Sequence, residues 1–162
     1  MGMRLRSSDE MIRSRLPLAA ILVAVVLAAC GGRPAVTVAV AGQTVAMALA
    51  STTEGTRCST THGDSFVQDP PLTVIRAPTP VTLVIDAGQG ATGIRGWLYD
   101  VDTPSPSGGP IEEFTLPGRS ASYQARSIVP GRTYNVLVNV TWTSLVISGE
   151  VTHVFRVRIE PP

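Results

Sequence analysis

Hydrophobic and polar residues alternate with a period of two through most of the chain after residue 35. The clearest runs are 132–142, where Tyr134, Val136 and Trp142 fall on one face, and 150–159, where Val151 and Phe155 do so. This period is typical of β-strands that bury one face. The same reasoning predicts strands near 72–76, 81–86, 93–101, 111–116 and 120–127.

The segment before residue 72 has two patterns. Residues 36–40 and 45–49 alternate on either side of the turn sequence 41–44, which predicts a hairpin. Residues 51–71 are rich in Ser, Thr, Gly and Asp and predict a polar loop, with room for one short strand around Phe66. No stretch after residue 35 has a convincing helical period, so we expect an all-β, antiparallel sandwich.

One segment connects this pattern to a known fold. Ile128-Val129-Pro130-Gly131-Arg132-Thr133-Tyr134 resembles the entry to the penultimate strand of fibronectin type III domains. The resemblance implies that Tyr134 packs in the core and that its hydroxyl bonds upstream backbone, as in a tyrosine corner. Trp97 is a candidate core tryptophan, although it lies one strand later than the fibronectin pattern places it. We therefore expect an immunoglobulin-like sandwich over 70–162 and leave its exact topology open.

The N-terminal segment carries a different signal. A basic start precedes an apolar run over 16–29, which ends in Leu27-Ala28-Ala29-Cys30. Fourteen residues are too few to span a bilayer, which takes about 20. The run resembles the signal peptide and lipobox of bacterial lipoproteins, which implies cleavage after Ala29, diacylglycerol on the Cys30 sulfur and often a further acyl chain.

An ordinary secretory signal that happens to precede a cysteine is the alternative. Met1, Met3 and Met11 all remain possible starts. The expected organisation is a cleaved signal over 1–29, a lipidated tether over 30–34, a hairpin and polar loop over 35–69, and the sandwich over 70–162, with the last two parts forming one compact unit.

The charge and cysteine content limit the kinds of binding partner and the disulfide bonds to be expected. After residue 29 the chain holds nine arginines and ten acidic residues, a difference of −1. Nucleic acid is not an expected partner, because phosphate binding requires a concentrated basic surface. If Cys30 is lipidated, Cys58 has no partner within the chain, and burial as a small hydrophobic residue is the simplest expectation.

Possible metal ligands occur in two places. Cys58, His62 and Asp64 lie within seven residues, but a structural zinc site needs four ligands and no second Cys/His pair is present. Asp100 and Asp102 offer carboxylates at a strand end, whereas calcium takes six to eight oxygens. We expect a solvated loop and ordinary turn residues instead, with no metal or cofactor. His153 is expected to face inward on the last strand.

The connection between the last two strands is unusually apolar, which makes it a candidate binding surface. Exposed Trp142, Leu145, Val146 and Ile147 would mark a contact with a protein or a membrane. Alternatively, the strands run longer and these side chains close one end of the core.

These observations predict an extracytoplasmic, membrane-anchored envelope lipoprotein that is not an enzyme and acts by binding an envelope protein, a glycan or a small ligand. The alternatives are a structural spacer or an accessory subunit of an envelope assembly, and a metal carrier or enzyme centred on Cys58, His62 and Asp64.

Overall fold

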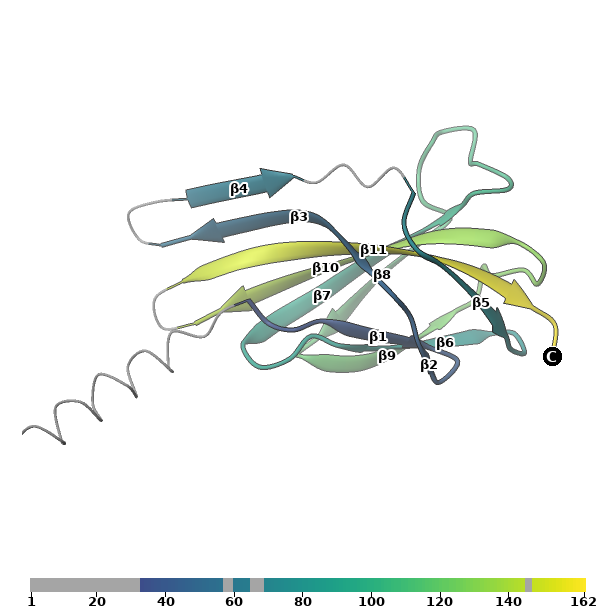
Figure 1. Cartoon of the computed structure of the whole chain (residues 1–162), viewed down its shortest axis with the longest axis horizontal. Coiled ribbons are helices and arrows are strands. Elements are labelled where there is room, and N and C mark those ends of the chain that lie inside the picture. The colour runs from purple at the N-terminus through teal and green to yellow at the C-terminus, as the bar shows by residue number, and fades with distance from the viewer. Residues whose placement is uncertain (1–32, 57–59, 65–68, 145–146) are drawn as a thin grey trace, which may run out of the picture. The chain divides into compact units, whose positions relative to one another are not determined.

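The alternating segments form strands in two layers (Figure 1). The computed structural model describes residues 33–56, 60–64, 69–144 and 147–162. None of these residues lies in a helix, and so the described part holds no helix that could cross a membrane. The strands are β1 (Thr37–Val40), β2 (Gln43–Thr44), β3 (Ala48–Gly55), β4 (Thr60–Asp64), β5 (Leu72–Arg76), β6 (Val81–Asp86), β7 (Ala91–Asp100), β8 (Glu112–Pro117), β9 (Ser120–Ala125), β10 (Thr133–Thr143) and β11 (Ser148–Glu160).

The two sheets together make an all-β, sandwich-like fold. The four-stranded sheet has the order β2-β1-β6-β9, and the seven-stranded sheet has the order β4-β3-β11-β10-β7-β8. The seventh strand of the larger sheet, β5, pairs with β11 in parallel, from Arg156 opposite Leu72 to Glu160 opposite Arg76. One side of β11 is thus shared by β3 over residues 148–154 and by β5 over residues 156–160.

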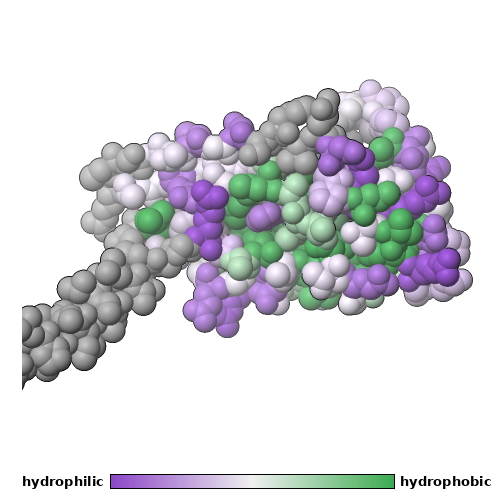
Figure 2. Space-filling model, in the orientation of Figure 1, coloured by the Kyte–Doolittle hydropathy of each residue, from purple (hydrophilic) through white to green (hydrophobic). Residues whose placement is uncertain are grey.

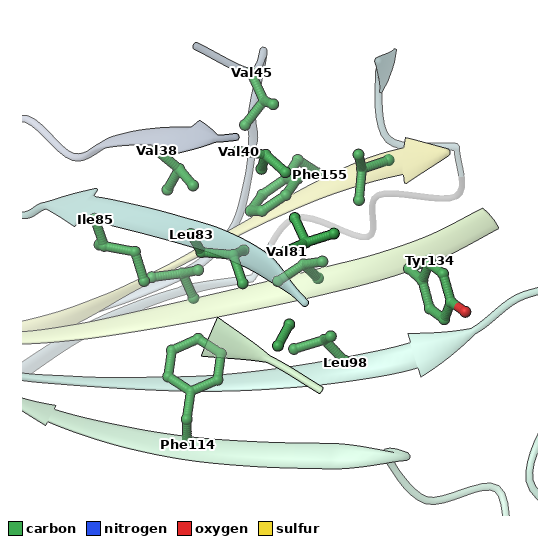
Figure 3. Close-up of a cluster of buried hydrophobic side chains, with 14 of the residues drawn as sticks. Val38, Val40, Val45, Val81, Leu83, Ile85, Leu98, Phe114, Tyr134 and Phe155 are labelled. Atoms are coloured by element: carbon green, nitrogen blue, oxygen red, sulfur yellow. The ribbon is translucent and has the colours of Figure 1, made fainter. Parts of the chain in front are cut away.

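The core lies between the sheets. Figure 3 shows Val38, Leu83 and Phe155 among the hydrophobic side chains gathered there, and all three are at most 1% exposed. Phe114 of β8 lies against Gly96 of β7, where a Cβ atom would meet the ring at 1.9 Å. Burial of these alternating faces is the main favourable term in folding.

Tyr134 ties the turn before β10 to the core. Its side chain is fully buried, and its hydroxyl accepts a hydrogen bond from the Val129 backbone N–H at 2.7 Å. The same hydroxyl lies 3.3 Å from the Val129 carbonyl oxygen. The bond to upstream backbone predicted for Tyr134 is therefore present.

A second contact, between two aromatic rings, joins the two sheets. The ring of Tyr123 in β9 stacks on that of Phe114 in β8, with centroids 4.3 Å apart and planes inclined by 20°. The Tyr123 hydroxyl donates a hydrogen bond to Glu112, which also accepts from the backbone N–H of Ser127 at 2.8 Å. Burial, followed by the bond and charge of Glu112, raises the pKa of Tyr123 to about 12.

The segment before β5 differs from expectation. Only Gln43 and Thr44 return along β1, and the chain then crosses to the seven-stranded sheet as β3. The expected polar loop over 51–71 is wrong in part, because its first half forms β3 and β4, paired from Ser51 opposite Asp64 to Gly55 opposite Thr60. Both strands carry polar residues on both faces, so neither shows the alternation that marks a half-buried strand. Phe66 lies outside the described residues.

Two other features of the fold differ from the sequence-based predictions. The pairing of β5 with β11 is parallel, an exception in an otherwise antiparallel fold. Trp97 is not a core residue: on β7 the buried positions are Ile94, Gly96, Leu98 and Asp100, so Trp97 lies on the opposite face and is half-buried.

The N-terminal segment is outside the described ranges, and with it the predicted signal peptide, the lipobox and Cys30. The described residues from 33 to 162 cluster as one compact unit, which includes those between 35 and 64 and the strands that follow them.

Candidate binding face

The outer face of the seven-stranded sheet, the side turned away from the core, brings together residues from six strands. Strand register aligns them in rows, since paired residues point to the same side of a sheet. One row runs from β8 to β4 and consists of Pro117, Gly93, Thr141, Glu150, Thr53 and His62.

A second row lies beside the first, two residues along each strand. It consists of Thr115, Arg95, Asn139, Thr152, Ser51 and Asp64. Neighbouring strands are about 4.8 Å apart and same-face residues about 6.7 Å apart along a strand. The two rows therefore form a broad strip of hydroxyl, amide and charged side chains.

Aromatic residues continue this face along β7. Trp97 follows Arg95 on the same side, opposite Leu137 of β10 and Glu113 of β8. Tyr99 is the next residue on that side and pairs with Asn135. Both rings are half-buried, so part of each is open to solvent.

The strip is hollowed where glycines replace larger side chains. A hollow of about 350 Å³ is lined by Gly93, Ile94, Arg95, Thr115, Asn139, Thr141 and Glu150. An adjoining hollow of about 380 Å³ is lined by Thr53, Gly55, Thr60, Thr141, Ser148, Gly149 and Glu150. The two hollows adjoin, since both are lined by Thr141 and Glu150, and together they are called the groove.

Some polar groups of this face are already bonded and others are not. The Asn139 amide donates to Thr152 at 2.9 Å, and Thr141 donates to the Gly93 carbonyl at 3.3 Å. Among the described residues, the side chains of Arg95, Glu113 and Glu150 make no hydrogen bond or ion pair. These three charged groups are available to bind a ligand.

The first set of possible metal ligands is partly on this face. His62 and Asp64 are exposed residues of β4, at the ends of the two rows, and the His62 Nδ1 atom lies 3.1 Å from the Thr53 hydroxyl. Cys58 lies outside the described residues. Within the described ranges, no three His, Cys, Asp or Glu side chains are grouped so that they could hold a metal ion.

The second set is elsewhere and is bound by protein donors. Asp100 accepts hydrogen bonds from Arg132 at 2.8 Å and from the backbone N–H groups of Thr103 and Asp102 at 2.8 and 2.9 Å. Asp102 accepts one from the Thr133 N–H at 2.7 Å. Burial acts to raise the pKa of Asp100, but these hydrogen bonds outweigh it and leave the pKa below its usual value. The two carboxylates thus brace the turn after β7.

The apolar connection between the last strands is shorter than the sequence indicates, because β10 extends to Thr143 and β11 begins at Ser148. This extension places Trp142 on the inward side of β10, where it is only 4% exposed, which is the alternative in which the strands run longer and the side chain closes one end of the core. Among the described residues, its indole N–H has no hydrogen-bond partner. Ile147 is half-buried, and Leu145 and Val146 lie outside the described residues.

His153 faces the side of the sheet that carries the core. It pairs with Val138, whose side chain is fully buried, and with Leu49 of β3. Burial, and then the nearby charge of Arg33, lowers the pKa of His153.

Sequence reasoning missed the outer face of the seven-stranded sheet. Trp97 and Tyr99 are on the same phase of alternation as Gly93 and Arg95, and Ile94 and Leu98 are on the other. This alternation could have predicted that Trp97 and Tyr99 face outward with Arg95, because Ile and Leu are more often buried than Arg. Comparison of the chain with protein-family models, with curated proteins and with solved structures finds no match in any of the three.

Proposed function

We propose that this chain is a lipid-anchored, extracytoplasmic envelope protein whose immunoglobulin-like domain acts by binding, without catalysis, through the outer face of its seven-stranded sheet. The observation that carries the proposal is the groove over Thr141 and Glu150, flanked by half-buried Trp97. Ligand sites are typically concave, with aromatic side chains and a few convergent polar groups.

The immunoglobulin-like assignment is supported by strand order. In such domains one sheet runs A-B-E and the other C-F-G. Here β1-β6-β9 and β7-β10-β11 follow those orders, and β8 continues the second sheet beyond β7. The Tyr134 corner at the start of β10 corresponds to that of strand F.

Anchoring is supported by the sequence Leu27-Ala28-Ala29-Cys30 and by the short apolar run before it. Two or more acyl chains hold a protein stably at a membrane, whereas one chain does not. A tethered domain meets membrane-bound partners at a high effective concentration, so even a weak site becomes useful.

Two experiments test the parts separately. Growth with an alkyne fatty acid should label the chain, and Cys30→Ala should abolish both the label and membrane retention. Retention of the unlabelled Cys30→Ala variant on membranes would contradict lipid anchoring.

Binding is tested in intact cells with a photo-crosslinking amino acid in place of Tyr99. Val84 serves as the matched control position, since it is 42% exposed on β6 in the other sheet. We expect a defined crosslinked product from position 99 and not from position 84. No product from either position would favour the structural spacer.

A further inference from the structure

We propose that the outer face of the seven-stranded sheet binds a neutral oligosaccharide chain, with its sugar rings stacked on Trp97 and Tyr99 and its hydroxyls in the groove over Thr141 and Glu150. This inference rests on the proposed binding function and names its ligand class. The face combines the two kinds of surface that a pyranose needs, a flat apolar platform for its C–H face and hydrogen-bonding groups for its hydroxyl rim.

The polar composition of the groove favours a polyhydroxyl ligand. Of its described lining residues, Arg95 and Glu150 are the charged ones, so their charges offset each other. A phosphate or an acidic polymer needs a concentration of positive charge that this groove does not supply. The hydroxyls of Thr115, Thr60 and Ser148 make no hydrogen bond with another described residue.

The groove floor is formed by small residues. Gly93 lines the first hollow and has no side chain on the outer face, so its backbone borders the hollow. Gly149 lines the second hollow, but it pairs with the inward Trp142 and a Cβ atom there would collide with the Thr53 carbonyl oxygen, so this glycine lets β11 and β3 approach closely. Close approach to backbone is a recurrent reason for glycine in a strand. A sugar ring could thus lie near the sheet surface, within reach of Asn139, which keeps its carbonyl oxygen free after donating to Thr152.

The outward-facing residues of β7 also extend far enough to contact several units of an oligosaccharide. Residues 93, 95, 97 and 99 alternate on one side of β7, and three steps of about 6.7 Å give a strip about 20 Å long. That length accommodates several linked sugar units. Figure 2 shows hydrophobic and hydrophilic residues interspersed over the side of the molecule in view.

Tryptophan fluorescence of the purified full chain in detergent provides the assay, because the chain has only Trp97 and Trp142. The buried Trp142 is replaced by Phe, so that Trp97 alone reports. The probes are hexasaccharides of α-linked glucose, β-linked glucose, β-linked N-acetylglucosamine and mannose. We expect saturable binding of at least one probe.

Variants then locate the site. Trp97→Ala, followed by calorimetry, is expected to weaken binding about tenfold, the loss of one stacked aromatic contact. Arg95→Ala should weaken it as well, and Trp97→Phe should restore most of it. Val84→Ser, on the outer face of the other sheet, should change nothing, and equal melting temperatures would show that each variant is folded.

Three results would overturn the inference in different ways. Binding that survives both Trp97→Ala and Arg95→Ala would place the sugar elsewhere. No binding of any probe, together with capture of an envelope protein from position 99, would replace the glycan by a protein and leave the proposed function intact. No probe binding and no crosslinked product would remove both proposals.

Discussion

Gly96→Ala is expected to destabilise the fold even though alanine suits a β-strand better than glycine. A Cβ atom at residue 96 would lie 1.9 Å from Phe114 Cζ and 2.4 and 2.5 Å from two further ring atoms. The Phe114 ring cannot simply rotate, because Tyr123 stacks on it. Overpacking of this kind costs about 1–3 kcal/mol.

An opposing effect reduces the net change. Replacing glycine by alanine lowers the entropy of the unfolded chain and stabilises by about 0.4–1 kcal/mol where the backbone permits it. Gly96 is in extended strand, so this gain applies. We therefore expect a net loss of about 1–2 kcal/mol in the free energy of unfolding, or a melting temperature lower by roughly 3–10 °C.

Urea denaturation followed by circular dichroism measures this quantity. Gly109→Ala is the matched control, since its nearest neighbour is Ser107 Oγ at 3.4 Å, an ordinary contact. Combining Gly96→Ala with Phe114→Leu should recover part of the loss, because the smaller side chain makes room for the methyl group. A Gly96→Ala variant as stable as the unchanged chain would refute the reasoning.

Three other substitutions test separate features of the fold. Ala41 has φ of 48° in the turn between β1 and β2, so Ala41→Asn should raise stability by about 0.5–1 kcal/mol in thermal melts, and an unchanged or lower melting temperature would contradict this. Tyr134→Phe leaves the Val129 N–H without its partner and should cost about 1–3 kcal/mol in urea titrations, whereas a loss below 0.5 kcal/mol would argue against the corner. The lowered pKa of Asp100 adds stability at neutral pH that is lost as the pH falls through the folded-state pKa, so Asp100→Asn should flatten the acid limb of the stability profile; a parallel profile would exclude this role.

Strand positions could be predicted wherever one side of a strand is buried. Val81, Leu83 and Ile85 alternate with exposed or half-exposed residues, and β6 has the predicted bounds. β3 and β4 could not be found this way, because Ser and Thr occupy both faces at the edge of the sheet. β4 pairs only with β3 among the described strands, and β3 takes its place in the sheet by pairing with β11, about 100 residues further along the chain.

The candidate site was harder to predict than the strands. The Tyr134 corner joins two residues that are close in sequence, Val129 and Tyr134, so the local sequence was enough to predict it. The groove instead depends on register across six strands, which brings Gly93, Thr141 and Glu150 into one row. Alternation along a single strand shows which side a residue takes and not which residues of other strands stand next to it.

The shared side of β11 has a consequence for how the domain is made. β3 pairs with β4 on one side, but among the described residues the other side of β3, and β5, pair only with residues 148–160. A chain that emerges from the ribosome or a translocon N-terminus first must hold β5 and that side of β3 unpaired until the last strand has followed. Pairings so distant in sequence form slowly, so the unfinished chain exposes strand edges for most of its synthesis, and chaperones would act on it during that interval.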